Sequence, residues 1–134
     1  MALNPKLSVL GRNRALNGAV DTVLDSGFLR IYDGTQPTDA DTAIGAQVML
    51  AELTLAATAF AAASAASKAA GAIGSIAAAA TGTASWGSFV TSGGPRALDF
   101  SVGTSGANLN LNSVAISSGA TVACSSFTLT MAAG

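Results

Sequence analysis

Residues 81–131 read TGTASWGSFVTSGGPRALDFSVGTSGANLNLNSVAISSGATVACSSFTLTM, and this stretch decides the fold of the chain. Apolar and polar side chains alternate in short runs, which puts Trp86 and Val90 on one side of a strand and Phe89 on the other. The runs are separated by glycine-containing turns at 92–95, 103–106 and 117–119. Turn signals about every 8–12 residues between alternating runs are typical of a β-sandwich or barrel.

The later strands of this stretch follow the same alternation. The side chains that share a strand face are Leu98, Phe100 and Val102, then Leu109 and Leu111, then Val114 and Ile116. Val122 and Cys124 also share a face, but from Phe127 to Met131 the alternation resumes one residue out of step. A β-bulge at Ser125-Ser126 explains this change of phase.

Residues 8–25 show helical spacing instead. The apolar side chains expected on one helix face are Leu16, Ala19, Val20, Val23 and Leu24, and those expected to point outward are Arg12, Arg14, Asn17 and Asp21. Gly18 weakens this helix by about 1 kcal/mol relative to alanine. Gly27 follows the last turn, where a left-handed cap is commonly needed. We therefore expect a helix that packs over one end or face of the strands.

Two strands follow the helix. Residues 28–32 place Leu29 and Ile31 on one side and end at turn residues 33–37. Residues 48–55 form the second strand, with Glu52 pointing outward. The side chains expected on its buried side are Met49, Ala51, Leu53 and Leu55.

These patterns together predict a mainly β protein, an antiparallel β-sandwich or barrel-like domain with one N-terminal α-helix. The length of 134 residues fits a single domain over 1–134, with an arm and helix at 1–27 and the β-sandwich at 28–134. Aromatic residues make up only 5% of the chain, so the core is thin for its length. Burial against a partner would add stability.

The alanine-rich residues 56–81 fit two structures. Alanine is the best helix former, and a helix over 61–70 is one possibility. The segment has no convincing apolar stripe to bury, however, and strands flank it on both sides. We expect extended and loop structure here, with small side chains that permit close approach of backbones.

Charge is unevenly distributed along the chain. The formal net charge is −1, but after Glu52 the charged side chains are only Lys68, Arg96 and Asp99. A freely diffusing protein usually has a surface of which about a quarter or more is charged. We infer that much of the surface that this portion forms is either covered by neighbours or coated with serine, threonine and asparagine side chains. The chain has no basic stripe interleaved with aromatic residues, which argues against nucleic-acid binding.

The residue types argue against catalysis. Histidine is absent, and with it the commonest general base and metal ligand. The seven carboxylates are scattered, and Lys68 as a lone base has no supporting residue beside it. The single cysteine, Cys124, alternates with Val122 and is expected to be a buried small hydrophobe instead of a reactive thiol. We therefore do not expect an enzyme or a cofactor.

The sequence argues against three further features. Asp33, Asp39 and Asp41 gather within nine residues, but their order does not match a calcium loop, so turn and capping roles are expected and no metal. Residues 1–24 lack the unbroken apolar core of a secretory signal. Residues 56–80 are too weakly hydrophobic for a membrane span.

Lys6, Arg12 and Arg14 give the chain a small basic start. They form either a solvated helix face or a docking patch for an acidic partner. These three residues are the candidate docking residues of the sequence, and the strand edges with their apolar, serine and asparagine side chains are the candidate contacts between subunits.

Several segments resemble a family of small tailed-bacteriophage virion proteins. They are ATGTASW at 80–86, VGTSGANLNLN at 102–112, SSGATV at 117–122, LRIYDGTQP at 29–37 and LAELTL at 50–55. The resemblance covers most of the chain from residue 28 onward, and the alternating Asn and Leu of 108–112 are its most specific feature.

The resemblance implies a structural role on the phage head. We expect a decoration or cement protein that is made in the host cytoplasm and lies on the outer capsid surface. Its expected partners are the major capsid protein and copies of itself, as a trimer. Neither nucleic acid nor a membrane is an expected partner. The alternative is a tail, fibre or head-to-tail connector component that binds a host-surface glycan. Exposed aromatic side chains would favour glycan binding, but Trp86 and Tyr32 lie in predicted strands and are expected in the core.

Overall fold

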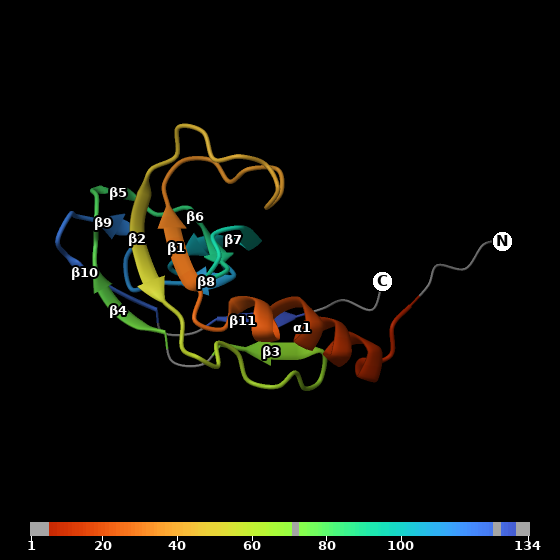
Figure 1. Cartoon of the computed structure of the whole chain (residues 1–134). Helices are drawn as coiled ribbons and strands as arrows, with labels where there is room; N and C mark the ends of the chain where they lie inside the picture. Colours follow the sequence, from red (N-terminus) through yellow and green to blue (C-terminus); the bar gives the residue numbers. More distant parts are fainter. Residues whose placement is uncertain (1–5, 71–72, 125–126, 131–134) are drawn as a thin grey trace.

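The computed structural model describes residues 6–70, 73–124 and 127–130, and it begins with a helix (Figure 1). Helix α1 spans Val9–Leu24, and the Ser8 hydroxyl oxygen caps it by accepting a hydrogen bond from the Gly11 N–H at 3.1 Å. The predicted helix is therefore confirmed within one residue at each end.

The buried stripe of α1 is narrower than its sequence predicts. Leu16, Val20 and Leu24 are buried, as expected, but Val23 is 41% exposed. These three buried positions are spaced four residues apart and follow a single ridge of the helix, which leaves Val23 beside that ridge. The side chains of Ala19 and Asp21 lie outside the described part of the structure.

The turn after α1 differs from the predicted glycine cap. Ser26, with a φ of 57°, takes the left-handed conformation in place of Gly27. Gly27 is needed for another reason, because a Cβ atom there would lie 2.3 Å from the carbonyl oxygen of Val90. The missing side chain thus lets the chain enter the sheet in close contact with a neighbouring strand.

The main sheet has five strands in the order β2-β1-β6-β7-β8. These strands are β1 (Phe28–Tyr32), β2 (Met49–Thr54), β6 (Trp86–Val90), β7 (Arg96–Gly103) and β8 (Leu109–Asn110). The pairs β1–β2, β1–β6 and β6–β7 are antiparallel, but β7 and β8 are parallel. This pair departs from the antiparallel expectation because residues 104–108 fold back beside β7, where the Asn108 side chain accepts a hydrogen bond from the Ser101 N–H at 3.1 Å.

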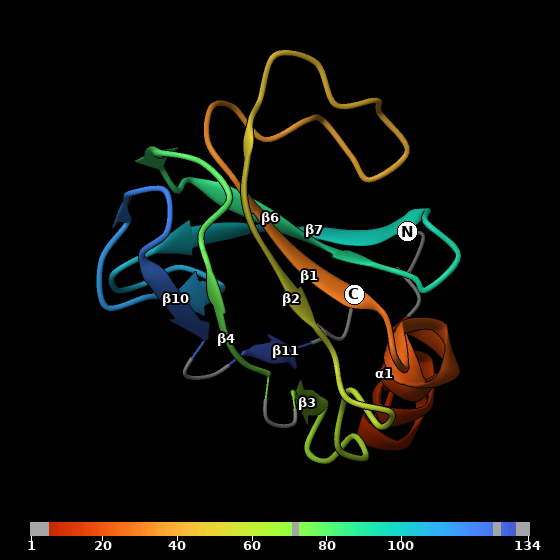
Figure 2. The same cartoon turned by 60° about the vertical axis from the view of Figure 1, so that its left-hand side comes forward.

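Three two-stranded sheets complete the β-structure (Figure 2). They pair β3 (Ser67–Ala69) with β11 (Thr128–Thr130), β4 (Gly74–Ala77) with β10 (Thr121–Cys124), and β5 (Gly82–Thr83) with β9 (Ala115–Ile116). With the main sheet they curl into a half-barrel. The structure is mainly β with one N-terminal helix, which confirms the predicted fold class.

An aromatic cluster fills the concave side of the half-barrel. The Phe89 ring lies 4.8 Å from Phe127, 5.0 Å from Phe100 and 5.3 Å from Phe60, measured between ring centroids. All four rings are buried. Four strand or bridge segments far apart in the chain therefore meet in one core, with Leu24 of the helix in the same cluster.

The alanine-rich segment is extended, as expected, and the alternative helix over 61–70 is wrong. Ser64 bridges to Ser67, and β3 then pairs with β11. The tight turn puts Ala65 and Ala66 at φ values of 50° and 60°. Such angles are costly for alanine, and the turn is held because the Asn13 side chain accepts a hydrogen bond from the Ala66 N–H at 2.8 Å.

The strand faces agree with the alternation in β1 but not in β6, where all five residues are buried, nor fully in β2. Leu29 and Ile31 are fully buried on the concave face. In β2 a register shift opposite Ile31 and Tyr32 lets both Leu50 and Ala51 become buried, whereas Met49 is half-buried. The predicted bulge at 125–126 and the predicted burial of Met131 lie outside the described residues.

Candidate interaction surfaces

The start of α1 exposes apolar side chains next to cations. Leu7, Val9 and Leu10 are 43%, 47% and 62% exposed. Leu10 and Arg14 are four residues apart and so lie on the same side of the helix. The sequence contains a sign of this exposure. The buried residues Leu16, Val20 and Leu24 recur every four residues, and neither Leu7 nor Leu10 fits that spacing. Neither residue is on the apolar helix face predicted above.

The structure separates the three predicted docking residues. Lys6 and Arg14 are exposed, whereas Arg12 is half-buried and its Nε atom is out of contact with solvent. Lys6 and Arg14 can therefore meet a partner directly, and Arg12 contributes mainly to the packing of the helix. The docking role itself stays a prediction.

The cations of α1 stand at the wrong end for helix stability. The positive end of a helix macrodipole favours acidic residues, and cations are favoured at the other end. The first turn of α1 has no acidic residue and its last turn no basic one. A cation at this end of α1 therefore gains no stabilisation from the helix dipole.

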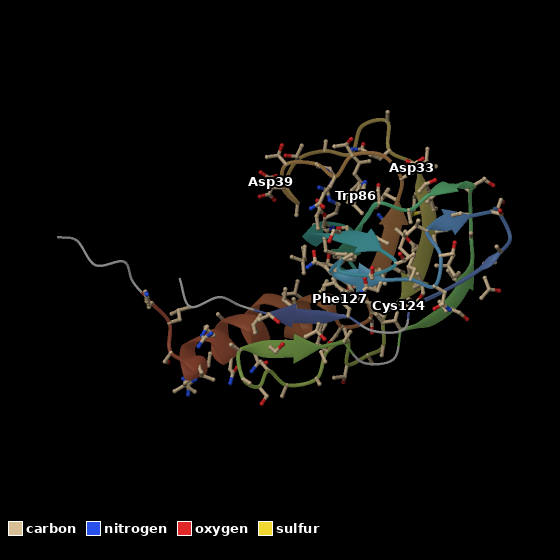
Figure 3. All side chains as sticks on the ribbon, turned by 180° about the vertical axis from the view of Figure 1, so that it is seen from behind. Asp33, Asp39, Trp86, Cys124 and Phe127 are labelled. Carbon is tan, nitrogen blue, oxygen red and sulfur yellow. The ribbon has the colours of Figure 1, made fainter. Side chains whose placement is uncertain are left out.

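Residues 53–130 present a surface without exposed ionic side chains. The ionic side chains that this part of the sequence contains are Lys68, which is fully buried, and Arg96 and Asp99, whose side chains are 9% and 3% exposed. Arg96 and Asp99 form a two-pronged ion pair, with Nη2 2.9 Å and Nε 3.1 Å from the two carboxylate oxygens. We call the solvent-facing side chains of the described residues in 53–130 the neutral surface (Figure 3).

The ribbon of β4 and β10 forms one part of the neutral surface. All four residues of β4 are exposed, including Ile76 at 41%. Thr121 and Ala123 of β10 are exposed beside it. A groove of about 140 Å³ lies next to β10, lined mainly by small and apolar side chains of residues 111–116 and 120–123. This ribbon offers a partner a row of small uncharged side chains.

Asp33 and Asp39 shape the long loop at 33–48, which we call the acidic loop. The Asp33 carboxylate accepts a hydrogen bond from the Val48 N–H at 2.6 Å and closes the base of the loop. The Asp39 carboxylate accepts bonds from the Thr42 hydroxyl and N–H at 2.8 Å each, and these bonds lower the pKa of Asp39 below its usual value. The predicted turn roles of these two residues are confirmed.

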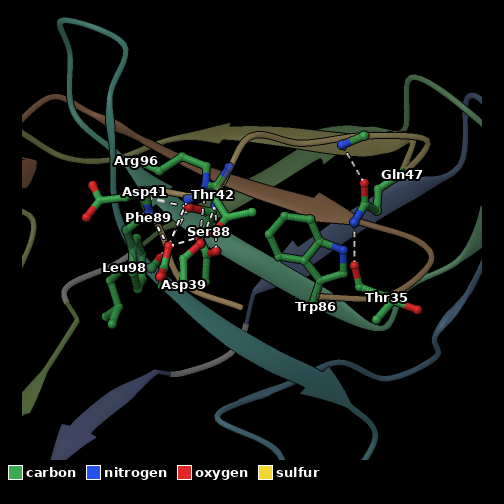
Figure 4. Close-up of polar contacts among 12 residues, drawn as sticks. Thr35, Asp39, Asp41, Thr42, Gln47, Trp86, Ser88, Phe89, Arg96 and Leu98 are labelled. Carbon is green, nitrogen blue, oxygen red and sulfur yellow. Dashed lines mark hydrogen bonds and ion pairs between the residues drawn. The ribbon is translucent and has the colours of Figure 1, made fainter. Parts of the chain in front are cut away.

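Asp41 is a second exposed carboxylate in this loop and lies beside Asp39. Its N–H donates to the Asp39 carboxylate at 3.1 Å, which helps to hold the tip of the loop (Figure 4). Within the described residues, no three His, Cys, Asp or Glu side chains come close enough to hold a metal ion. The loop therefore presents negative charge through Asp39 and Asp41 at its exposed tip.

Tyr32 and Trp86 lie in the interior beneath the acidic loop. They are 4% and 1% exposed, and their rings stack at 4.4 Å. The Trp86 indole N–H donates to the Asp33 carbonyl at 3.0 Å. The Arg96 guanidinium lies 5.8 Å from the indole ring, and Figure 4 shows both side chains near the acidic loop. Core packing is confirmed for both rings, so neither offers a platform on which a sugar could stack.

Lys68 and Cys124, the two isolated reactive groups, both lie in packed surroundings. The Lys68 amine is fully buried and donates to the Asn17 side chain at 2.7 Å. Asn17 also accepts from the Ala63 N–H, so it faces the segment before β3 and not solvent, which corrects the outward position predicted for it. Cys124 is half-buried and packs against the core.

Comparison with known proteins adds no relative. No protein-family model matches the chain, and no curated protein and no solved structure is similar enough to count as a match. Among the described residues, no helix has both the length and the hydropathy needed to cross a membrane.

Proposed function

We propose that this chain is a structural virion protein of a tailed bacteriophage. In this proposal it is a decoration or cement protein, which binds the assembled head shell from outside and stabilises it. The observation that supports the proposal is the neutral surface, because residues 53–130 bury all three of their ionic side chains. A protein that diffuses alone usually keeps such a large part of its surface charged.

A surface without exposed charge suits permanent contact with neighbours. Covering an ionic side chain removes it from water, and this desolvation costs free energy unless the partner compensates for it. Small uncharged side chains such as those of β4 and β10 avoid that cost. On a lattice of identical sites, neighbouring subunits can therefore cover this surface of every copy without burying a charge.

Stabilisation of the shell follows from mass action in this proposal. A protein that binds only the assembled shell lowers the free energy of that state by an amount that grows with its concentration relative to the Kd. The proposed partners are the major capsid protein and further copies of this chain, arranged as a trimer, because closed symmetry matches a symmetric shell. No catalytic step, nucleic acid or membrane is part of the proposal.

Heads of the encoding phage, assembled without this chain, provide the test. We expect the purified chain to bind them and to raise the temperature at which they lose their packaged contents. If the chain binds, we expect electron-microscopic reconstruction of the decorated heads to show it on the outer surface. Failure to bind, with unchanged heat stability of the heads, would remove the proposal.

A substitution on β4 tests whether the neutral surface makes the contact. Ile76→Lys places a charge on the exposed ribbon, and we expect it to weaken binding to heads while the isolated chain keeps its stability. Ile76→Gln is the matched control, because it changes shape and polarity without adding charge. Equal binding of the lysine variant, the glutamine variant and the unsubstituted chain would show that the contact lies elsewhere.

A further inference from the structure

The chain carries two surfaces of opposite charge. The start of α1 with the residues before it, 6–14, contains the cations Lys6, Arg12 and Arg14 and no anion. Residues 31–51 contain three aspartates and no cation. Lys6 and Arg14 are exposed on the first surface, and Asp39 and Asp41 on the second. Each copy therefore has one patch that attracts the other.

Within one copy these two patches are held apart by the sheet. Strand β1 begins just after α1 and ends where the acidic loop begins, so the helix and the base of the loop lie at opposite ends of the strand (Figures 1 and 2). The loop is fixed in place, because Arg96 donates to the Asp39 carbonyl at 3.0 Å and Ser85 donates to the Gly34 carbonyl. The natural occupant for each patch is thus the opposite patch of a second copy.

Exposed apolar side chains accompany the cations. Leu7 and Leu10 lie beside Lys6 and Arg14 at the start of α1. Protein interfaces usually combine an apolar centre with a polar rim. Arg14 does not stand where the helix dipole would favour a cation, since cations are favoured at the other end of α1.

We propose that the start of α1 of one copy binds the acidic loop of a second copy, with Lys6 and Arg14 facing Asp39 and Asp41. The two patches differ, so the contact is head to tail and closes into a ring if the rotation permits. The inference rests on the proposed function for its place on the head, since it names the contact between neighbouring copies. It answers which acidic partner the basic start of the chain binds.

Charge reversal on both sides tests the contact in the purified full-length chain. We expect Arg14→Glu and Asp41→Lys each to weaken self-association about tenfold or more, and the double variant to restore it, because the reversed charges again attract. Light scattering after size exclusion, over a concentration series at low and high salt, measures the association. High salt weakens the contact of the unsubstituted chain, because salt screens exposed charges.

The substituted positions are chosen so that the variants stay folded, and weaker association then reports on the contact itself. Arg14 and Asp41 are exposed, and a glutamate near the positive end of α1 favours the helix. Circular dichroism checks the fold of each variant, and Arg14→Gln replaces Arg14→Glu if the latter does not fold. Val23→Glu and Val23→Lys, at an exposed position of α1 outside both patches and outside the neutral surface, are matched controls that we expect to associate like the unsubstituted chain.

Three results would overturn the inference: an unsubstituted chain that is monomeric at all concentrations, single variants that associate normally, or a double variant no better than the single ones. These results are separate from those on heads. Self-association that obeys the charge rule, without binding to heads, supports this inference and removes the proposed function. Normal binding to heads by a chain that stays monomeric in solution supports the proposed function and removes this inference.

Discussion

Residues 6–52 and residues 53–130 use charged side chains in opposite ways. The first region contains ten ionic side chains, and Lys6, Arg14 and Asp41 among them are exposed. The second contains three, all of them buried in polar contacts. The number of ionic residues in a region therefore does not give the charge of its surface, because ionic side chains that are buried in polar contacts leave the surface neutral.

The largest effect expected from this comparison concerns the core of the second region. Phe89→Ala should lower the free energy of unfolding by about 3–5 kcal/mol, because it opens a cavity among Phe60, Phe100 and Phe127. Urea unfolding measures the loss. Phe28→Ala, at a half-buried ring of the first region, is the control and should cost clearly less. Equal losses would show that the aromatic cluster is not the centre of stability.

The next effect compares one ion pair from each region. Asp99→Asn leaves Arg96 buried without its charge partner and should cost about 3 kcal/mol. Glu52→Gln breaks the pair of Arg30 and Glu52, whose side chains are 30% and 35% exposed, and should cost at most about 1 kcal/mol. Urea unfolding of both variants decides the matter. A larger loss for Glu52→Gln would reverse the distinction drawn between the two regions.

A pair of glycines tests where α1 joins the sheet. Gly27→Ala should destabilise the protein by about 1–3 kcal/mol, because the new methyl group would meet the Val90 carbonyl. Gly18→Ala adds a methyl group into open space on the same helix and should stabilise by roughly 0.5–1 kcal/mol. Thermal unfolding measures both changes. Two changes of the same sign would contradict the close approach at Gly27.

The smallest effect is local to the acidic loop. Hydrogen bonds from Thr42 lower the pKa of Asp39, so the stabilisation of the loop by the ionised carboxylate is present above the unfolded pKa and is lost as the pH falls through the folded pKa. Thr42→Val removes the hydroxyl donor and should raise the pKa of Asp39 toward 3.8. Carbon NMR titration of the carboxyl group measures the pKa. An unchanged pKa would mean that the hydroxyl does not hold the carboxylate.

Strand β1 was predictable from sequence because its burial has a period of two from Phe28 to Ile31. In β1, Leu29 and Ile31 face the core, as their spacing requires. The alanine-rich segment was predictable for a different reason, since a helix there would have had no apolar stripe to bury. Its pairing was not predictable: β3 pairs with β11, about sixty residues along the chain.

The candidate docking surface was predicted only in part. Lys6 and Arg14 are exposed where the sequence placed them, but Arg12 turns inward and Val23 outward. Helix periodicity gives the direction of each side chain around the axis. It does not say how wide a stripe the rest of the protein covers, and that width decided both positions.

The sequence by itself determined that charge is concentrated before residue 53, that short alternating strands dominate and that a helix precedes them, because composition and periodicity are local properties of a chain. Only the tertiary structure decided that the remaining ions are hidden. Lys68 is buried against Asn17 of α1, and Arg96 lies between Trp86 and the acidic loop. Each of these contacts joins residues distant in sequence or on separate elements, so the neutrality of the surface is a consequence of packing.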